Sequence, residues 1–274
     1  MSLEKLLNRS VILIDKPKGP TSFDMVEKVS GMLKVKKAGH SGTLDPNATG
    51  LLVIGLGESR KAMPVLTGLD KEYTGVMELH SDVTRKEVEK VLKEFVGEII
   101  QTPPVKSAVA RKPRKRRVYE IEVTEKLERT VKFRVLCEAG TYVRLIAHEA
   151  GEKLGCGAHL KDLRRTRVGP FKVEHSIQPV QLKKMSGNTL RQILIPLEEA
   201  LNMVNVPRIV IKSEHEKLVR NGSPVRRGFV KKVYGKAENG DDIVVFSESG
   251  TAVCLAKYVS EGDNVAKTDR VFLE

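Results

Sequence analysis

The sequence predicts an α+β protein that ends in a small β-rich module. Over the first two thirds of the chain, helix signals are separated by short apolar runs with strand character. After Pro207 the pattern changes to short strands separated by glycine-rich turns. The length of 274 residues corresponds to roughly two domains. We therefore expect a first domain over residues 1–205, which includes a connector at 176–205, and a second over 206–274.

Four helices are expected. Capping-box patterns at Thr21–Asp24 and Thr84–Glu87 predict the starts of two of them. Apolar residues then follow on one face, namely Phe23, Val26, Val29 and Leu33 in the first helix and Val88, Val91, Leu92 and Phe95 in the second. A third helix is predicted over 142–154, and a short fourth from Ser213 to the Asn221-Gly222 stop signal.

Strands are expected between these helices. Residues 11–15 form a short apolar run, and 73–79, 118–124 and 131–137 have strand character, the last with clean alternation. In the second domain, strands are predicted over 208–211, 243–246 and 252–258.

Several classes of protein are excluded by what the sequence lacks. No apolar run approaches the ~20 residues of a membrane span, and the N-terminus has no signal-peptide layout. The three cysteines form no CxxC pair and the six histidines are scattered, so neither a disulfide framework nor a metal site is predicted. Nucleotide-binding glycine motifs are also missing. We expect a cytoplasmic protein without a metal or cofactor.

The charge is large and unevenly distributed. The net charge is +13, of which residues 207–274 contribute only +2. A protein this basic is expected to bind polyanions, most often nucleic acid, although solubility or an anionic membrane surface would also account for the charge. The excess is concentrated in two stretches, 102–117 with seven basic side chains and 159–172 with five. Prolines in the first stretch favour a loop.

One carboxylate stands out in the glycine-rich loop 39–50. Asp45 precedes Pro46 in this loop, and rigid turn residues around an acid hold it with little freedom, as catalysis requires. A surface turn is the alternative, and composition alone favours it. Arg144 lies in the first turn of the predicted third helix and could hold Asp45 in a bidentate pair. Their spacing does not establish that they meet.

Six segments occur in the order found in TruB-type pseudouridine synthases. They are DKPKGPTSFDMV (15–26), GHSGTLDPNATGLL (39–52), KEY (71–73), QTPPVKSAV (101–109), AGTYVRLIAHEAG (139–151) and LRRTRVGPF (163–171). The resemblance spans about residues 11–175 and is closest to the archaeal and eukaryotic dyskerin branch. The C-terminal section resembles a PUA domain, a small RNA-binding β-barrel, on PRIVIKSEHEKLVRNGSPV (207–225) and the strand pattern.

This resemblance implies a fold and a reaction. The fold would be a mixed, mostly antiparallel central sheet flanked by helices, followed by a PUA barrel. The reaction would convert specific uridines in RNA to pseudouridine without a cofactor. Asp45 matches the catalytic aspartate, which either attacks the sugar C1′ or removes a sugar proton. Tyr73 matches the tyrosine that stacks on the flipped base, and Arg144 matches the arginine that pairs with the aspartate.

Further residues match the substrate pocket and the RNA-binding surface of the family. Tyr142 and Leu163 match pocket walls, His40 a residue that wedges the target nucleotide out, and Lys16 a first motif that supports the site. Basic side chains would grip RNA phosphates through a mobile loop after residue 101 and through the second basic stretch. The predicted contacts are Lys106, Arg111, Lys112, Arg114, Lys115, Arg116, Arg117, Arg164, Arg165 and Arg167.

The dyskerin-like features imply a catalytic subunit of a box H/ACA ribonucleoprotein. A guide RNA would select uridines in substrate rRNA or tRNA. Nop-type, Gar-type and kink-turn-binding proteins would be partners, while DNA and membranes would not. The chain lacks long lysine-rich tails, which favours an archaeal or prokaryote-like cytoplasm. Two alternatives stay open: a stand-alone enzyme that acts on the tRNA T-loop, and a non-catalytic RNA-binding scaffold.

Overall fold

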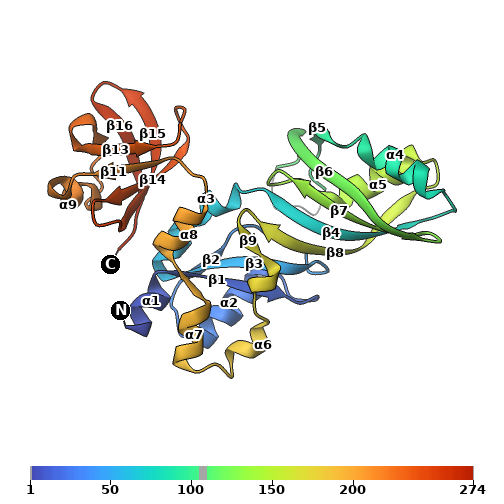
Figure 1. Cartoon of the computed structure of the whole chain (residues 1–274), viewed down its shortest axis with the longest axis horizontal. Coiled ribbons are helices and arrows are strands. Elements are labelled where there is room, and N and C mark those ends of the chain that lie inside the picture. The colour runs from blue at the N-terminus through green and yellow to red at the C-terminus, as the bar shows by residue number, and fades with distance from the viewer. Residues whose placement is uncertain (1, 105–109, 274) are drawn as a thin grey trace.

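The computed structural model describes residues 2–104 and 110–273, and these residues form two β-sheets with helices packed around the larger one (Figure 1). Lys106, one of the predicted RNA contacts, lies outside the described residues.

The larger sheet has ten strands among the described residues, in the order β10-β1-β3-β8-β4-β7-β6-β5, with β2 on β3 and β9 on β8. Among the described strand pairs of this larger sheet only β3–β8 is parallel, so the sheet is mixed and mostly antiparallel, which confirms the prediction. The strands are β1 (Ser10–Lys16), β2 (Ala38–His40), β3 (Thr49–Leu56), β4 (Lys71–Leu79), β5 (Gly97–Gln101), β6 (Arg114–Leu127), β7 (Thr130–Cys137), β8 (Ala158–Val168), β9 (Phe171–Lys172) and β10 (Leu194–Pro196).

Helices flank both halves of this sheet (Figure 1). Helix α2 (Ser22–Leu33) packs on β1 and β3, whereas α4 (Arg85–Lys93) and α5 (Val143–Lys153) pack on the half that contains β4, β6, β7 and β8. None of the helices in residues 2–104 and 110–273 is long and apolar enough to cross a membrane. The shorter helices are α1 (Leu3–Asn8), η1 (Gly57–Ala62), α3 (Met63–Thr67), η2 (Val173–His175), α6 (Pro179–Leu182), α7 (Gly187–Ile193) and α8 (Leu197–Met203).

Both predicted capping boxes are present. The hydroxyl oxygen of Thr21 accepts a hydrogen bond from the Asp24 amide, and the Asp24 carboxylate accepts one from the Thr21 amide. The same reciprocal pair starts α4 at Thr84 and Glu87. One predicted core position is wrong, because Phe23 is 64% exposed. Met25 occupies the buried face of α2 instead.

The first apolar run is buried on both faces, which explains why it does not alternate with polar residues. Val11 and Leu13 pack in one hydrophobic cluster with α8, and Ile12 and Ile14 pack in another with α2. A strand covered on both sides reads as a continuous apolar run.

The basic segment that was predicted to be a loop is partly strand. Residues 114–117 begin β6 and pair with β5, so the loop prediction is wrong for Arg114 to Arg117. The ladder hydrogen bonds are supported by ion pairs of Lys115 with Glu98 and of Arg116 with Glu138. These carboxylates offset the repulsion among the cations.

In the part of the chain that the structure describes, the second sheet has six strands in the order β12-β16-β15-β14-β11-β13 and curls into a half-barrel (Figure 1). Its strands are β11 (Arg208–Ile211), β12 (Val225–Arg226), β13 (Val230–Tyr234), β14 (Asp242–Ser247), β15 (Ala252–Glu261) and β16 (Asn264–Val271). Short helical turns η3 (Ser213–His215), α9 (Glu216–Arg220) and η4 (Arg227–Phe229) complete it. The predicted fourth helix is thus broken into a 3-10 turn and a five-residue helix.

The chain end joins the two sheets, and we call these contacts the C-terminal clasp. The Arg9 guanidinium donates to the Leu273 carbonyl at 2.7 Å, and the Lys61 ammonium donates to the Val271 carbonyl at 2.6 Å. The Leu273 amide donates to the Glu58 carboxylate at 2.9 Å. Phe272, which follows β16, is fully buried in a cluster that also contains residues of β14 and α8, so the two sheets share a hydrophobic core.

Candidate active site

The loop between β2 and β3 brings Asp45 to Arg144. An Asp45 carboxylate oxygen lies 3.0 Å from an Arg144 guanidinium nitrogen, and the two side chains are 54% and 52% exposed. Asp45 comes from the glycine-rich loop and Arg144 from the first turn of α5. The pair is open to solvent, so a ligand can reach the carboxylate.

A buried lysine, Lys16, fixes the Asp45 loop through hydrogen bonds to its backbone carbonyls. The Lys16 side chain is fully buried, and its ammonium donates to the carbonyls of Pro17, Pro46 and Ala48 at 3.1, 3.1 and 2.7 Å. The carbonyls of Pro46 and Ala48 belong to the loop just after Asp45. Burial lowers the pKa of Lys16, and the charge of Asp45 partly opposes this shift. Lys16 therefore supports the Asp45 loop and is not part of an exposed pocket surface.

Arg165 lies inside the protein, so its predicted role as an RNA contact is wrong. Its side chain on β8 is 1% exposed. The guanidinium donates to the carbonyls of Leu51, Gly42 and Thr43 at 2.8, 3.1 and 3.5 Å. These oxygens replace the hydration that the cation loses on burial. Arg165 thus ties β8 to the loop before Asp45, at Gly42 and Thr43, and to β3 after it, at Leu51.

Tyr73 lies on β4 beneath the loop. It is 8% exposed and packs in one cluster with Leu44 and Ala48, against which Leu163 of β8 also packs. Burial raises the pKa of Tyr73, and Arg165 opposes this shift through its charge and a hydrogen bond. The phenol is therefore protonated at neutral pH. The structure brings Tyr73, Leu163 and the Asp45 loop together.

Lys71 shares the buried face of β4 with Tyr73. Its ammonium donates to the carbonyls of Thr67 and Leu69 at 2.8 and 2.6 Å. Burial, followed by the charge of Arg165, lowers the pKa of Lys71 to about 8.

The sequence did not indicate two residues, Gln101 and Ser22, whose side chains fix distant backbone segments of the site by hydrogen bonds. The Gln101 side chain accepts from the Tyr142 amide at 2.9 Å and donates to the Tyr142 carbonyl at 3.1 Å. It thereby fixes the N-cap residue of α5, two positions before Arg144. The Ser22 hydroxyl exchanges the same kind of reciprocal pair with the backbone of Leu44. Each is a single polar side chain that bonds a distant backbone, so local sequence carries no signal for it.

His40 forms part of the loop scaffold. Its Nδ1 accepts a hydrogen bond from the Gly42 amide at 3.2 Å, which requires that this nitrogen carry no proton. Burial, followed by the charge of Arg165, lowers the pKa of His40. The ring is therefore neutral at physiological pH.

The other predicted RNA contacts differ in how exposed they are and in whether a carboxylate already pairs with them. Arg164 makes a bidentate pair with Asp15 at 2.9 and 2.8 Å, and Arg167 lies 3.8 Å from Glu72. Both cations are already partly neutralised by these carboxylates. The exposed side chains are those of Arg111, Lys112, Arg114, Lys115 and Arg117, of which Lys115 pairs with Glu98.

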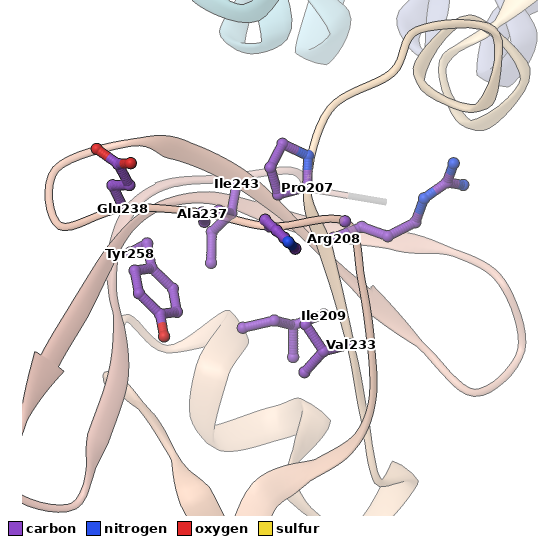
Figure 2. A pocket seen from close by; sticks show the side chains of 10 residues that line it. Pro207, Arg208, Ile209, Val233, Ala237, Glu238, Ile243 and Tyr258 are labelled. Carbon is purple, nitrogen blue, oxygen red and sulfur yellow. The ribbon is translucent and has the colours of Figure 1, made fainter.

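The C-terminal half-barrel contains a separate cavity of about 380 Å³ (Figure 2). Its wall combines apolar residues such as Ile209, Val233 and Ile243 with Tyr258 and Arg208. On the adjacent strand, Tyr234 has Lys232 at 4.6 Å and Arg208 at 5.7 Å from its ring centre. An exposed aromatic face with flanking cations is typical of nucleic-acid contacts.

Comparison with protein families accounts for most of the chain. Residues 30–143 match the N-terminal domain of TruB family pseudouridylate synthases, and residues 144–202 match a C-terminal domain of tRNA pseudouridylate synthase B. Residues 207–271 match the PUA domain. A probable tRNA pseudouridine synthase B of Methanopyrus kandleri is 38% identical over 98% of this chain and 81% of its own length. The corresponding protein of Nanoarchaeum equitans is 39% identical over 92% and 74%.

Solved structures agree with these matches. A chain of a Cbf5-Nop10-Gar1 complex superposes on all of this chain with a TM-score of 0.90 and 36% identity, and 88% of that chain is covered. A chain of an archaeal box H/ACA Nop10-Cbf5 complex gives 0.89 and 34%, with 89% covered.

Together, the fold, the family matches and these relatives define a pseudouridine synthase with a PUA domain. More specifically, the chain belongs to the TruB family of pseudouridine synthases and is similar over its whole length to archaeal Cbf5, a dyskerin homologue.

Proposed function

We propose that this protein isomerises specific uridines in rRNA or tRNA as the catalytic subunit of a guide-RNA-dependent box H/ACA ribonucleoprotein. The observation that carries the proposal is the superposition of the entire chain, PUA domain included, on Cbf5 chains from Nop10 and Gar1 complexes. A similar chain has been solved in an H/ACA ribonucleoprotein bound to substrate RNA, with a TM-score of 0.86. Nop-type and Gar-type proteins are therefore the proposed partners, together with a kink-turn-binding protein.

Asp45 is the proposed catalytic residue. Its carboxylate is exposed, paired with Arg144, and mounted on a loop fixed by buried hydrogen bonds. Such a group can either bond to C1′ of the target nucleotide or remove a sugar proton while the glycosidic bond breaks. Because a base inside a helix is inaccessible, the nucleotide must leave the stack at a cost of a few kcal/mol.

Tyr73 is proposed to receive the flipped base. Stacking on an aromatic ring returns on the order of 1–3 kcal/mol per base. Because its phenol is buried and protonated, Tyr73 would act through its ring and its hydroxyl hydrogen bonds, not as a phenolate base. Leu163 and Tyr142 would complete the pocket walls, and His40 the wedge.

Replacement of the carboxylate tests the assignment of Asp45. We expect Asp45→Asn to abolish pseudouridine formation while RNA affinity stays within a few fold, because the amide keeps the shape and loses the charge. Pseudouridine is measured by nucleoside mass spectrometry and affinity by filter binding. A fully active Asn variant would show that Asp45 is not the catalytic group. The same variant addresses the scaffold alternative, since a scaffold would form no pseudouridine even as wild type.

The two enzymatic alternatives differ in what the protein requires. The curated relatives carry the name tRNA pseudouridine synthase B, which keeps the stand-alone activity in view. Purified protein is assayed on unmodified tRNA alone, and then with an H/ACA guide, a matched target and the partner proteins. Guide-dependent turnover supports the proposal, whereas robust turnover of tRNA without guide or partners favours the stand-alone enzyme.

The proposed domain division is 1–205 for catalysis and 206–274 for RNA anchoring. In the first domain, the exposed cations Arg111, Lys112, Arg114, Lys115 and Arg117 would hold phosphates. In the second, Tyr234 and its flanking cations offer a local contact that the low net charge of residues 207–274 does not preclude. Charge reversal at Arg114 and Arg117 is expected to weaken RNA binding and to reduce its salt dependence. An unchanged salt slope would contradict this part of the proposal.

A further inference from the structure

Three cations are buried beneath the Asp45 loop without a carboxylate partner. Lys16, Lys71 and Arg165 are 0%, 4% and 1% exposed. They donate hydrogen bonds to backbone carbonyls, and Arg165 also to the Tyr73 side chain; within residues 2–104 and 110–273 none of the three forms an ion pair. A buried charge is ordinarily paired with an opposite charge. Three unpaired ones at one site therefore need an explanation.

These cations lie close together. A Cβ placed on Gly42 would have the Lys71 Cε at 3.7 Å and an Arg165 guanidinium nitrogen at 3.8 Å. The charge of Arg165 also acts on Lys16, on Lys71 and on the ring of Tyr73. Two carboxylates act on these cations through their charge: Asp45, which is exposed and paired with a fourth cation, Arg144, acts on Lys16, and Asp70 acts on Lys71. The buried side of the site is therefore strongly electropositive.

Loop support explains only part of this arrangement. Lys16 and Arg165 bond carbonyls of the Asp45 loop itself. Lys71 instead bonds the carbonyls of Thr67 and Leu69, which lie at the end of α3 and after it. A neutral donor would satisfy those oxygens at a lower desolvation cost. The charge of Lys71 beside Tyr73 is the feature that a structural role leaves unexplained.

Resting on the proposed function, we propose that these buried cations stabilise the negative charge that develops on uracil when its glycosidic bond breaks. As C1′–N1 cleaves, its electron pair stays on the base and spreads over N1, O2 and O4. The ring then rotates, C5 bonds to C1′ and loses its proton, and N1 gains one. Fixed positive charge in a water-excluded site favours that anion without reorganisation. Lys71 and Arg165 act through their field, as positioning residues, while Asp45 acts on the sugar.

The experiment removes the charge of Lys71 and compares two target nucleotides whose base anions need different amounts of stabilisation. Lys71→Met and Lys71→Gln are neutral, the latter keeping an N–H donor, and Lys71→Arg keeps the charge. Each full-length variant is assembled with guide RNA and partner proteins. It is then given target RNA that carries either uridine or 5-fluorouridine at the reactive position. Fluorine withdraws electrons, so the fluorinated anion needs less stabilisation. Single-turnover loss of the original nucleoside is measured at pH 7, where Lys71 is protonated.

We expect the neutral variants to slow cleavage of uridine at least tenfold and that of 5-fluorouridine clearly less, with RNA affinity unchanged. Lys71→Arg should restore most of the uridine rate. Lys61→Met is the matched control, because Lys61 is a part-buried lysine that also donates to a carbonyl but lies in the C-terminal clasp. It should leave the ratio of the two rates unchanged.

Equal slowing of both substrates, or no slowing, would overturn the electrostatic role and leave Lys71 a purely structural residue. Far-UV circular dichroism checks that each variant folds. If Lys71→Met does not fold, Lys71→Gln still tests the loss of charge with a donor in place. Failure of the wild-type particle to convert uridine would count against the proposed function itself, which separates the two conclusions.

Discussion

Gly50 joins the Asp45 loop to the sheet, and replacing it with alanine tests how tightly the site is held. Gly50 pairs with Arg165 in the parallel β3–β8 contact and has φ +100°. A Cβ at this position would lie 2.3 Å from the Arg165 carbonyl oxygen and 2.8 Å from its amide nitrogen. Both atoms belong to the backbone, so relief requires the strands to separate.

The expected cost has two parts. A positive φ in a residue with a side chain costs about 1–2 kcal/mol. Overpacking against rigid neighbours costs roughly 1–3 kcal/mol more. Gly50→Ala should therefore lower the free energy of unfolding by about 2–5 kcal/mol. It should also reduce pseudouridine formation, because Arg165 holds the carbonyls of Gly42 and Thr43.

Gly97→Ala isolates the backbone part of this cost. Gly97 begins β5 with φ +111°, and no atom lies within 4 Å of its hypothetical Cβ. Its alanine variant should cost only about 1–2 kcal/mol. Urea unfolding is followed by far-UV circular dichroism, since the sequence contains no tryptophan. If Gly50→Ala were no more destabilising than Gly97→Ala, the close approach of β3 and β8 would not constrain the site.

Three further predictions follow from burial and local geometry. The pKa of His40 is lowered in the folded protein, so below pH 6.5 the unfolded chain binds more protons and the protein should become less stable. Urea unfolding at pH 7.5 and 5.5 should show a smaller loss of stability for His40→Gln than for the wild type. An identical loss in the two proteins would contradict this prediction. Burial raises the pKa of Cys137 and Cys254 to about 12, so iodoacetamide at pH 8 should label only Cys156 in the native protein. The labelled cysteines are identified by mass spectrometry. Label on Cys137 or Cys254 would show that burial does not keep these thiols unreactive. Gly31→Ala in α2 meets no atom within 4 Å and should stabilise the protein by about 0.5–1 kcal/mol in urea unfolding; a destabilised variant would show that this turn needs glycine.

Local signals predicted the elements that local interactions stabilise. The capping boxes of α2 and α4 are made by residues three apart, and both were found where the sequence indicated. Strand β8 was missed because its eleven residues carry many charges and read as surface. Its Arg165 is buried because carbonyls from residues 42, 43 and 51 converge on it, and no local pattern encodes that convergence.

The site shows the same division. Motif resemblance selected Asp45, Tyr73 and Arg144, and the fold brings these residues together. The predicted RNA contacts were chosen because their two stretches are basic. Composition does not distinguish Arg165, which is buried, from Arg117, which is exposed. Burial depends on strand register, which is set by pairing with β3 and β4.

The C-terminal clasp has a consequence for how a target is chosen. Arg9, Glu58 and Lys61 hold the last strand against the first domain, and Phe272 is buried between the two sheets. A joint of this kind resists bending, so the half-barrel and Asp45 stay at a constant separation. An RNA anchored on the half-barrel can then place only nucleotides at one distance along its path in front of the carboxylate. The clasp would thus fix the distance between the anchored end of the RNA and the modified uridine. Variants that loosen the clasp should modify uridines at additional positions before the reaction itself becomes slower.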